Sequence, residues 1–258
     1  MQTHHSIVLL RHASIIISLG NKKILIDPML SAKGEMDPVA NCGNDIRIPM
    51  TDLPLDTAAL GTLLSSVDAV IVTHLHRDHW DAAAQLLIQK DKPLFCQPPD
   101  ADTIKRQGFL HVQAVVDRYL WQGIAISRTG GRHGTGEIGE KMGPVSGFVL
   151  SYNGTAVYIA GDTIWCPEVK DALQQFNPGY TIVNAGAAKF LTGDPITMTP
   201  QDILQVHMQL PCTKIIAVHM DTVNHCFIKR NDLRTALPAN NWESWLSIPA
   251  DGEQINIV

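Results

Sequence analysis

The residues best suited to chemistry lie in one short stretch, residues 73–80, which reads Thr-His-Leu-His-Arg-Asp-His-Trp. Imidazole and carboxylate groups are ligands that borderline and hard divalent metals bind in proteins. An exposed turn can also collect such residues, but this stretch directly follows the apolar run 67–72, which is typical of a buried strand. The pattern therefore favours a metal site, and it offers four ligands within six residues: His74, His76, Asp78 and His79.

The spacing of these residues fits a strand that turns into a helix. Alternate side chains of an extended backbone point to the same side, so His74 and His76 should project together. Asp78 and His79 fall where the strand should end, just before a helix that begins near Asp81. The remaining ligands of a metal site must then come from other segments.

Three further residues stand where such ligands are expected. His133 lies in the glycine-rich run 131–136, whose backbone can bend closely around a metal. Asp162 and His219 each follow an apolar strand, and strands fix the position of side chains that the next loop exposes. Taken alone, Asp162 could equally form a turn or cap a helix. The joint pattern is stronger than any of its parts.

The order of the predicted elements indicates one α/β domain, residues 1–258, made of two similar halves. The layer rule favours two facing sheets with helices outside. Segment 31–57 and the glycine-rich run 130–143 are predicted as loops, and the tail with Trp242 and Trp245 should pack back on the body. Strands are predicted at 6–10, 15–19, 23–26, 67–72, 94–96, 112–116, 123–129, 145–152, 155–160, 181–184 and 214–219, and helices at 57–65, 81–90, 101–107, 167–175, 200–209 and 231–237.

Composition narrows the class of protein. The chain has 258 residues, of which 45% are hydrophobic and 17% charged, so it can bury a sizeable core. Its net charge of −5 gives no global preference for nucleic acid or anionic membrane. No apolar run reaches the roughly 18 residues that a membrane span needs, and the N-terminus lacks the features of a secretory signal. The five cysteines are scattered and contain no CxxC pair, so we expect a cytoplasmic protein.

Together, these motifs resemble the metallo-β-lactamase superfamily of metal-dependent hydrolases. The resemblance spans about residues 7–225. The branch that includes the ascorbate-6-phosphate lactonases is similar in the runs 10–14 (Leu-Arg-His-Ala-Ser) and 161–163 (Gly-Asp-Thr). The superfamily motifs are Thr73-His74-x-His76-x-Asp78-His79, then His133, Ala160-Gly161-Asp162-Thr163 and His219, after the early Ile24-Leu25-Ile26-Asp27-Pro28.

The resemblance implies a four-layer αββα sandwich with a dinuclear metal site at one edge of the sheets. By motif position, His74, His76 and His133 would bind one ion, and Asp78, His79 and His219 the other. Asp162 would bridge both ions, whereas Asp27 would support the ligand loop by hydrogen bonding. Zinc is the first choice because imidazole dominates the set, although Mn²⁺ or Fe²⁺ would also fit.

Such a site predicts hydrolysis. Two ions about 3.5–4 Å apart can share one water and lower its pKa toward neutrality. The resulting hydroxide would attack an ester, lactone, amide or phosphodiester of a small molecule, while a metal stabilises the developing oxyanion. Asp78 is assigned to catalysis as well as to metal binding. Substrate specificity should reside in segment 31–57, segment 186–198 and the C-terminal tail.

Several residues outside the ligand set are candidates for substrate contacts. His225 could protonate the leaving group or contact the substrate, although a surface or helix-capping histidine would look the same. Lys189, Arg47 and Arg132 could bind an anionic group, with solvated surface charges as the alternative. His12 is expected behind the ligands or in the core, and the alternation of the strand predicts that Arg77 faces away from the metals.

Other functions stay open. The same fold and most of the ligands could support iron-dependent oxidation of a thiol or persulfide, although the presence of both His79 and His219 favours two hydrolytic metals. A nucleic-acid phosphodiesterase shares the signature, but the net negative charge and the lack of a basic run count against it. A binding protein stabilised by metal is disfavoured by open coordination positions. We therefore expect a small-molecule substrate, either neutral or anionic, and no nucleic-acid or membrane partner. The sequence leaves open whether the chain forms a homo-oligomer.

Overall fold

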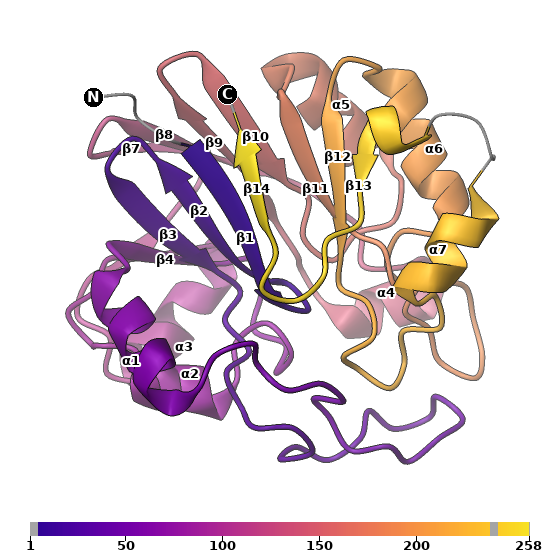
Figure 1. The fold of residues 1–258 in the computed structure, drawn as a ribbon, viewed down its shortest axis with the longest axis horizontal. Helices are drawn as coiled ribbons and strands as arrows, with labels where there is room; N and C mark the ends of the chain where they lie inside the picture. Colours follow the sequence, from indigo (N-terminus) through magenta and orange to yellow (C-terminus); the bar gives the residue numbers. More distant parts are fainter. Residues whose placement is uncertain (1–4, 238–241, 258) are drawn as a thin grey trace.

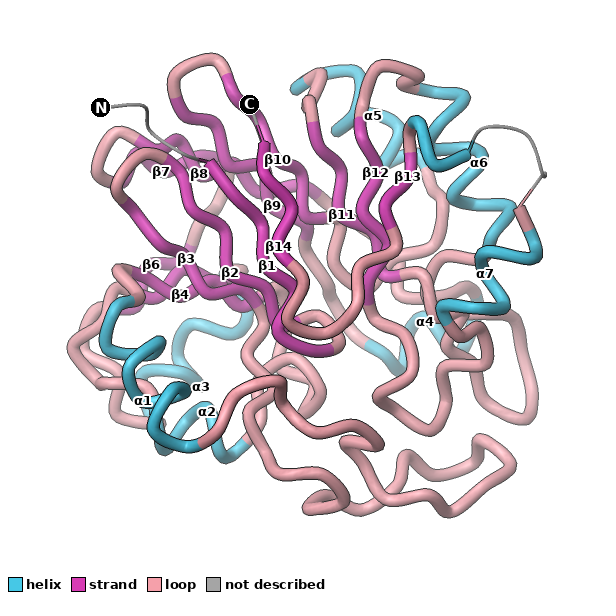
Figure 2. Tube along the Cα trace, viewed as in Figure 1, coloured by secondary structure: helices cyan, strands magenta, loops and turns pink. Residues whose placement is uncertain are grey.

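Two seven-stranded sheets face each other, with helices on both outer sides, in the computed structural model of residues 5–237 and 242–257 (Figures 1 and 2). This arrangement confirms the predicted αββα sandwich. The first sheet contains, in spatial order, β14 (Gln254–Ile257), β1 (His5–Arg11), β2 (Ser14–Leu19), β3 (Lys22–Ile26), β4 (Ala69–Val72), β5 (Leu94–Cys96) and β6 (Val112–Ala114). The second contains β13 (Leu246–Ser247), β12 (Lys214–Val218), β11 (Tyr180–Asn184), β10 (Thr155–Ile159), β9 (Gly147–Tyr152), β8 (Ile124–Thr129) and β7 (Arg118–Trp121).

Each half of the chain builds its sheet in the same way, from antiparallel hairpins followed by parallel strands. In the first sheet, β1 to β3 pair antiparallel and β3 to β6 pair parallel. In the second, β7 to β10 pair antiparallel and β10 to β13 pair parallel. Short turns allow the hairpins, as between β2 and β3, where Gly20 adopts a φ of +63°. The parallel strands need longer crossovers, which the helices supply.

Helices cover the outer face of each sheet (Figure 1). Apolar side chains fill the space between the sheets, among them Ile71 and Phe148, and two further apolar clusters lie between the sheets and their helices. The helices on the first sheet are α1 (Thr57–Ser66), α2 (Ala82–Leu87) and α3 (Ala101–Arg106), and those on the second are α5 (Pro167–Phe176), α6 (Pro200–Gln209) and α7 (Arg230–Ala236). Two short 3-10 helices span Pro98–Asp100 and Trp242–Ser244.

Some predicted elements differ from the structure. The run 130–143, predicted as a loop, contains the short helix α4 (Gly136–Met142), which has no fully buried residue and three glycines in or next to it. Strands β7, β13 and β14 were not predicted, because β7 is largely exposed and β13 has only two residues. The tail does pack on the body, since Trp242 and Trp245 contact the apolar cluster under α5–α7 and β14 pairs with β1.

The edge at which the parallel strands end positions the candidate site. The segment 73–80 follows β4, Asp162 follows β10, and His219 follows β12, so all three leave their sheets at carboxyl ends. The long segment between β3 and α1, which contains only an isolated bridge between Met36 and Ile48, runs along the lower border of the molecule (Figure 2).

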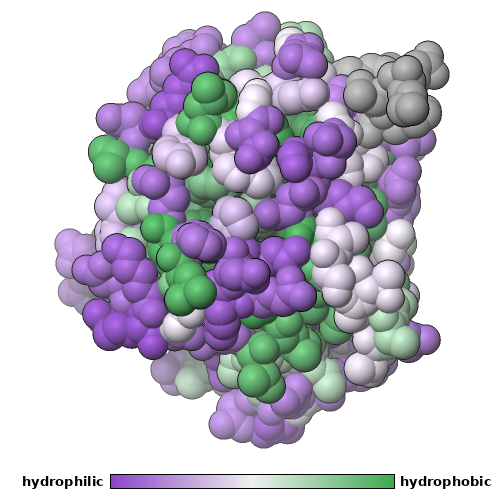
Figure 3. All heavy atoms as spheres, turned by 90° about the vertical axis from the view of Figure 1, so that its left-hand side faces the viewer, coloured by the Kyte–Doolittle hydropathy of each residue, from purple (hydrophilic) through white to green (hydrophobic). Residues whose placement is uncertain are grey.

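One face of the molecule presents a mixed surface. On the side of α1–α3 and β7, hydrophobic side chains form separate patches among polar ones (Figure 3). Within residues 5–237 and 242–257, every helix is too short to cross a lipid bilayer.

Candidate metal centre

All seven predicted metal ligands converge at this edge of the sandwich. Their potential ligand atoms form three overlapping groups, in each of which all atoms lie within 4.8 Å of one another. Every member is buried except His76, which is half-buried. The first group is His74, His76 and His133, and the second is Asp78, His79 and His219 together with His12. The third, His74, His79 and Asp162, overlaps both of them.

The first group contains nitrogen atoms at a spacing that suits a single metal ion. His74 Nε2 lies 3.0 Å from His76 Nδ1. Two atoms bound at about 2.0–2.1 Å to one tetrahedral ion lie roughly 3.3 Å apart, so this pair could share an ion. His133 Nε2 lies 3.4 Å from Asp162 Oδ2, which adds a nitrogen and an oxygen to the same surroundings.

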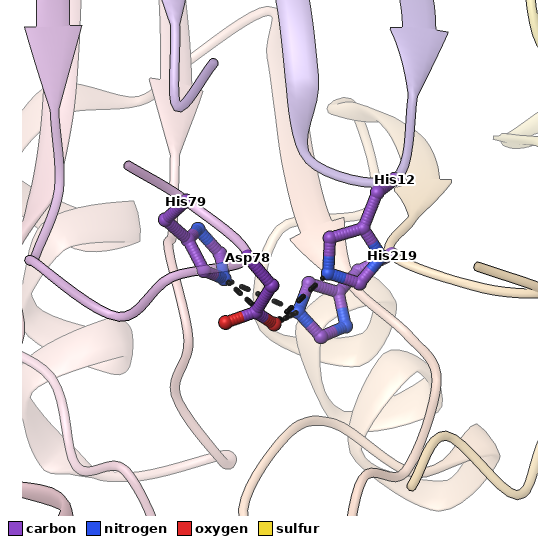
Figure 4. Close-up of side chains that lie close together, drawn as sticks. All are labelled: His12, Asp78, His79 and His219. Atoms are coloured by element: carbon purple, nitrogen blue, oxygen red, sulfur yellow. Dashed lines mark hydrogen bonds and ion pairs between the residues drawn. The ribbon is translucent and has the colours of Figure 1, made fainter. Parts of the chain in front are cut away.

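The second group has the same spacing on the other side of Asp162. His79 Nε2 lies 3.2 Å from His219 Nε2, and Asp78 Oδ2 lies 3.7 Å and 3.5 Å from these two nitrogens. The side chains of Asp78, His79 and His219, together with His12, point toward one another from three different segments (Figure 4). Asp162 Oδ2 lies 3.3 Å from His79 Nε2, and its Oδ1 lies 3.3 Å from His219 Nε2. Asp162 therefore contacts both groups.

Hydrogen bonds on the far side of the imidazoles of His74 and His79 fix their orientation. Asp27 Oδ2 lies 2.8 Å from His79 Nδ1, which turns Nε2 of that ring toward the cluster. Both oxygens of Asp27 also accept hydrogen bonds from Thr73, at 2.7 Å each, and Thr73 Oγ1 lies 3.0 Å from His74 Nδ1. Asp27 is thus a support of the ligand loop, as the resemblance implied.

The second half of the chain orients its ligands similarly. His133 Nδ1 donates to the carbonyl of Ile196 at 2.8 Å, which points Nε2 at Asp162. Asn184 Nδ2 donates to Asp162 Oδ1. His219 Nδ1 lies 3.4 Å from the thiol sulfur of Cys226, a weaker partner than a carboxylate or carbonyl. Asn184 was not identified from the sequence as a partner of Asp162, and its position at the end of a strand is the only local indication of this hydrogen bond.

His12 lies directly behind the second group, as expected. Its Nε2 lies 3.1 Å from Asp78 Oδ2, and its ring centre is 3.7 Å from that of His219. Burial and the neighbouring His219 lower the pKa of His12 to about 3, so its ring is neutral and Nε2 can donate one hydrogen bond to Asp78. This contact holds the carboxylate in place.

Opposite charges stabilise the buried cluster. Burial alone would lower the pKa of His79, but the carboxylates of Asp162, Asp78 and Asp27 outweigh it and raise the pKa to about 10. The pKa of His219 is likewise raised well above its ordinary value, against burial, chiefly by Asp162. Burial would raise the pKa of Asp162, but the surrounding histidines hold it well below the usual range. Protons on the imidazoles therefore occupy the place that cations would take.

A cavity of about 230 Å³ opens onto these ligands. Its lining includes four candidate ligands, His76, Asp78, His133 and Asp162, together with His225. Its apolar lining comes from three segments: Val39 and Ala40, Met142 of α4, and Phe190 and Ile196. Two of the three predicted specificity segments, 31–57 and 186–198, thus contribute, whereas the described residues of the C-terminal tail extend the sheets and do not line the cavity.

The charged residues around the cavity differ from those predicted. Arg77 is exposed and borders the cavity, and the prediction that its side chain faces away from the metals stays untested. Arg47 instead donates to the carbonyls of Gly34 and Glu35 and pairs with Asp37, which ties segment 31–57 to itself.

Lys189 and Arg132 also have other partners. The ammonium of Lys189 lies 5.2 Å from the ring centre of Phe227, and Arg132 pairs with Glu168 at 3.0 Å. None of Arg47, Lys189 and Arg132 lines the cavity, so substrate binding by these residues stays an untested prediction. A larger hollow of about 600 Å³ lies between β7–β9 and α5, but charged side chains of both signs line it and it holds none of the clustered ligands.

Metal binding should release protons. His79 and His219 are protonated near neutral pH without metal, because their pKa values are raised, and an imidazole must be neutral to bind an ion. Loading with Zn²⁺ should release about two protons per chain, and the apparent affinity should rise between about pH 6 and pH 8. Calorimetry in buffers of different ionisation enthalpy measures this number. His79→Ala should reduce it by about one, and a heat of binding that is independent of the buffer would contradict the charge assignment.

The chain is similar to known proteins over nearly its whole length. A family model described as a β-lactamase superfamily domain matches residues 22–220. The UPF0173 protein YddR of Bacillus subtilis is 36% identical over 252 residues, which cover 96% of this chain and 98% of that protein. A UPF0173 metal-dependent hydrolase of Saccharolobus solfataricus is 26% identical over 229 residues, 86% of this chain and 87% of that protein.

Solved structures agree with these relatives. A protein of Veillonella parvula described as a possible metal-dependent hydrolase has 37% identity and a TM-score of 0.93, with full coverage of both chains. An isothiocyanate hydrolase from Delia radicum gut bacteria has 36% identity and a TM-score of 0.90, with 97% of this chain and 98% of that chain covered. The ascorbate-6-phosphate lactonase branch is not among these relatives and stays a prediction. The chain belongs to the β-lactamase superfamily, and it is a metal-dependent hydrolase.

Proposed function

We propose that this chain binds two divalent ions and hydrolyses a small molecule at an electrophilic carbon or phosphorus. The observation that carries the proposal is the position of Asp162. Its two oxygens lie within 3.4 Å of nitrogens from both histidine groups, namely His133 on one side and His79 and His219 on the other. A carboxylate shared in this way suits a bridge between two ions. When bound, such a pair of ions activates a shared water and polarises the group under attack.

Zinc is our first choice for both ions. Five of the seven ligands are imidazoles and two are carboxylates, a set that zinc binds readily, although Mn²⁺ and Fe²⁺ would also fit. The hydrogen bonds that Asp27 and Ile196 accept from His79 and His133, and the one that Asn184 donates to Asp162, keep the metal-ligand atoms pointed at the centre. This pre-organisation lowers the cost of reorganising the site during the reaction.

Several classes of small molecule carry an electrophilic carbon or phosphorus that such a site could attack. The predicted candidates are esters, lactones, amides and phosphodiesters. Isothiocyanates are an additional candidate, because one relative that is 36% identical over 97% of this chain is an isothiocyanate hydrolase. In that reaction, water would add to the central carbon, the carbon–nitrogen bond would break, and the nitrogen would leave as an amine together with carbonyl sulfide. Iron-dependent oxidation of a thiol or persulfide is the alternative activity.

A panel assay with metal-free and zinc-loaded protein tests the function. We expect zinc-dependent hydrolysis of an ester, lactone, amide, phosphodiester or isothiocyanate, because the donor set can hold two ions beside an open cavity. Asp162→Ala should reduce kcat/KM by more than about 100-fold and lower the metal content, since it removes the shared carboxylate. Leu86→Ala, an exposed residue of α2, is the matched control. Oxygen uptake with one iron per chain would contradict hydrolysis, and efficient cleavage of tRNA precursors would contradict a small-molecule substrate.

We also propose that His225 contacts the substrate. It lines the cavity, and burial lowers its pKa to about 4, so the ring is neutral near pH 7. Among residues 5–237 and 242–257, no group forms a hydrogen bond with its buried Nδ1. A neutral ring is suited to a hydrogen bond with the substrate and less suited to act as a protonated acid.

His225→Ala should lower kcat/KM by about 10- to 100-fold while the metal content stays unchanged, because a hydrogen bond to the substrate is lost and no metal ligand is removed. Steady-state kinetics and elemental analysis measure the two quantities. His207→Ala is the control, since His207 stacks on Trp245 and does not line this cavity. Loss of metal in the His225 variant, or an unchanged kcat/KM, would show that the assignment is wrong.

A further inference from the structure

The cavity at the candidate metal ligands adjoins a second cavity. This neighbouring cavity of about 280 Å³ shares two of its lining residues, Met142 and Phe190, with the cavity at the ligands. Ile138 of α4 lines the second cavity as well. The side chains of Phe190, Met142 and Ile138, which we call the apolar wall, therefore lead from the metal centre to the surface.

The apolar wall is packed against a buried cluster, so its position is fixed by the fold. Phe190, Met142 and Ile138 are each partly buried and contact this cluster. Partly buried apolar side chains that remain open to a cavity can still cover apolar surface of a ligand. The buried members of the cluster are Met29, Ile48, Ala188, Ile196, Val223 and Cys226.

Charge is confined to the rim of the two cavities. Apart from the candidate ligands Asp78 and Asp162, the charged residues that line them are Arg77 and Lys141, and both are exposed. A charged group placed along the wall would lose water without gaining a buried partner, which is costly. An apolar group would gain from the same burial.

Phe190 connects the wall to the polar side of the site. Its ring is stacked on that of His225 at a centre distance of 6.1 Å and an interplanar angle of 27°. A molecule whose reacting group lies beside His225 and the metal ligands would therefore extend its remaining atoms over Phe190 toward α4.

We propose that the substrate carries an uncharged, apolar substituent that lies along Phe190, Met142 and Ile138, and that these side chains determine specificity. The inference rests on the proposed hydrolytic function, because the reacting group is placed at the metal centre. It names the substrate class as small molecules with an alkyl or aryl substituent next to the bond that is cleaved.

A homologous series tests the apolar wall. Substrates that share one reacting group and differ in alkyl chain length should gain roughly threefold in kcat/KM for each added methylene until the cavities are filled. Phe190→Ala and Met142→Ala should flatten this dependence on chain length, whereas Phe190→Leu should retain most of it. Leu120→Ala, exposed on β7, is the matched control. The proposal is overturned if kcat/KM of the wild-type protein does not depend on chain length, or if it is higher for a chain that ends in a carboxylate.

Binding without turnover separates this inference from the proposed function. Unreactive n-alkyl alcohols, titrated into the zinc-loaded protein and followed by NMR, should bind more tightly as the chain lengthens, and Phe190→Ala should abolish the trend. If this trend appears but no member of the substrate panel is hydrolysed, the apolar wall is supported and the proposed hydrolysis is wrong. If hydrolysis occurs without any effect of chain length in either measurement, the proposed function stands and the apolar wall is wrong.

Discussion

Buried charge is the constraint on which the site depends. A carboxylate in a protein interior is costly unless opposite charges and hydrogen bonds surround it. Asp162 and Asp78 meet this requirement because histidines from both halves of the chain converge on them, and because Asn184 and His12 donate a hydrogen bond to one carboxylate each. The same arrangement makes the centre a cation site, since ions can replace the protons that balance the carboxylates.

The two sheets must keep their relative position for this balance to hold. Residues 74–79 follow a strand of the first sheet, whereas Asp162 and His219 follow strands of the second. The ligands from the two sheets meet only because the apolar core between the sheets, including Ile71 and Phe148, fixes one sheet against the other. Packing far from the ligands therefore determines the distances at the centre. The apolar cluster behind the wall adds a second link, since it joins segment 31–57, α4 and segment 186–198.

The cluster of candidate ligands could be predicted from the sequence because most of its members are histidines or aspartates that follow an apolar run, while His133 lies in a glycine-rich run. The sandwich could be predicted for the same reason, since its buried strands are continuous apolar segments. The apolar wall could not, because Phe190 lies in a loop and Met142 in the short helix α4, and the two side chains meet only after folding. The roles proposed for Arg47 and Lys189 rested on charge alone, and a charged residue in a loop finds its partner through tertiary contacts that no local pattern describes. Strand β14 was not predicted, because it is stabilised by pairing with β1, which is far from it in the sequence.

Anomalous X-ray diffraction from crystals of the zinc-loaded protein tests the central claim, that Asp162 joins two metal positions, most directly. The account predicts two zinc peaks on either side of the Asp162 carboxylate, one next to His74, His76 and His133 and the other next to Asp78, His79 and His219. A single peak at full occupancy, or a metal that does not contact Asp162, would contradict it.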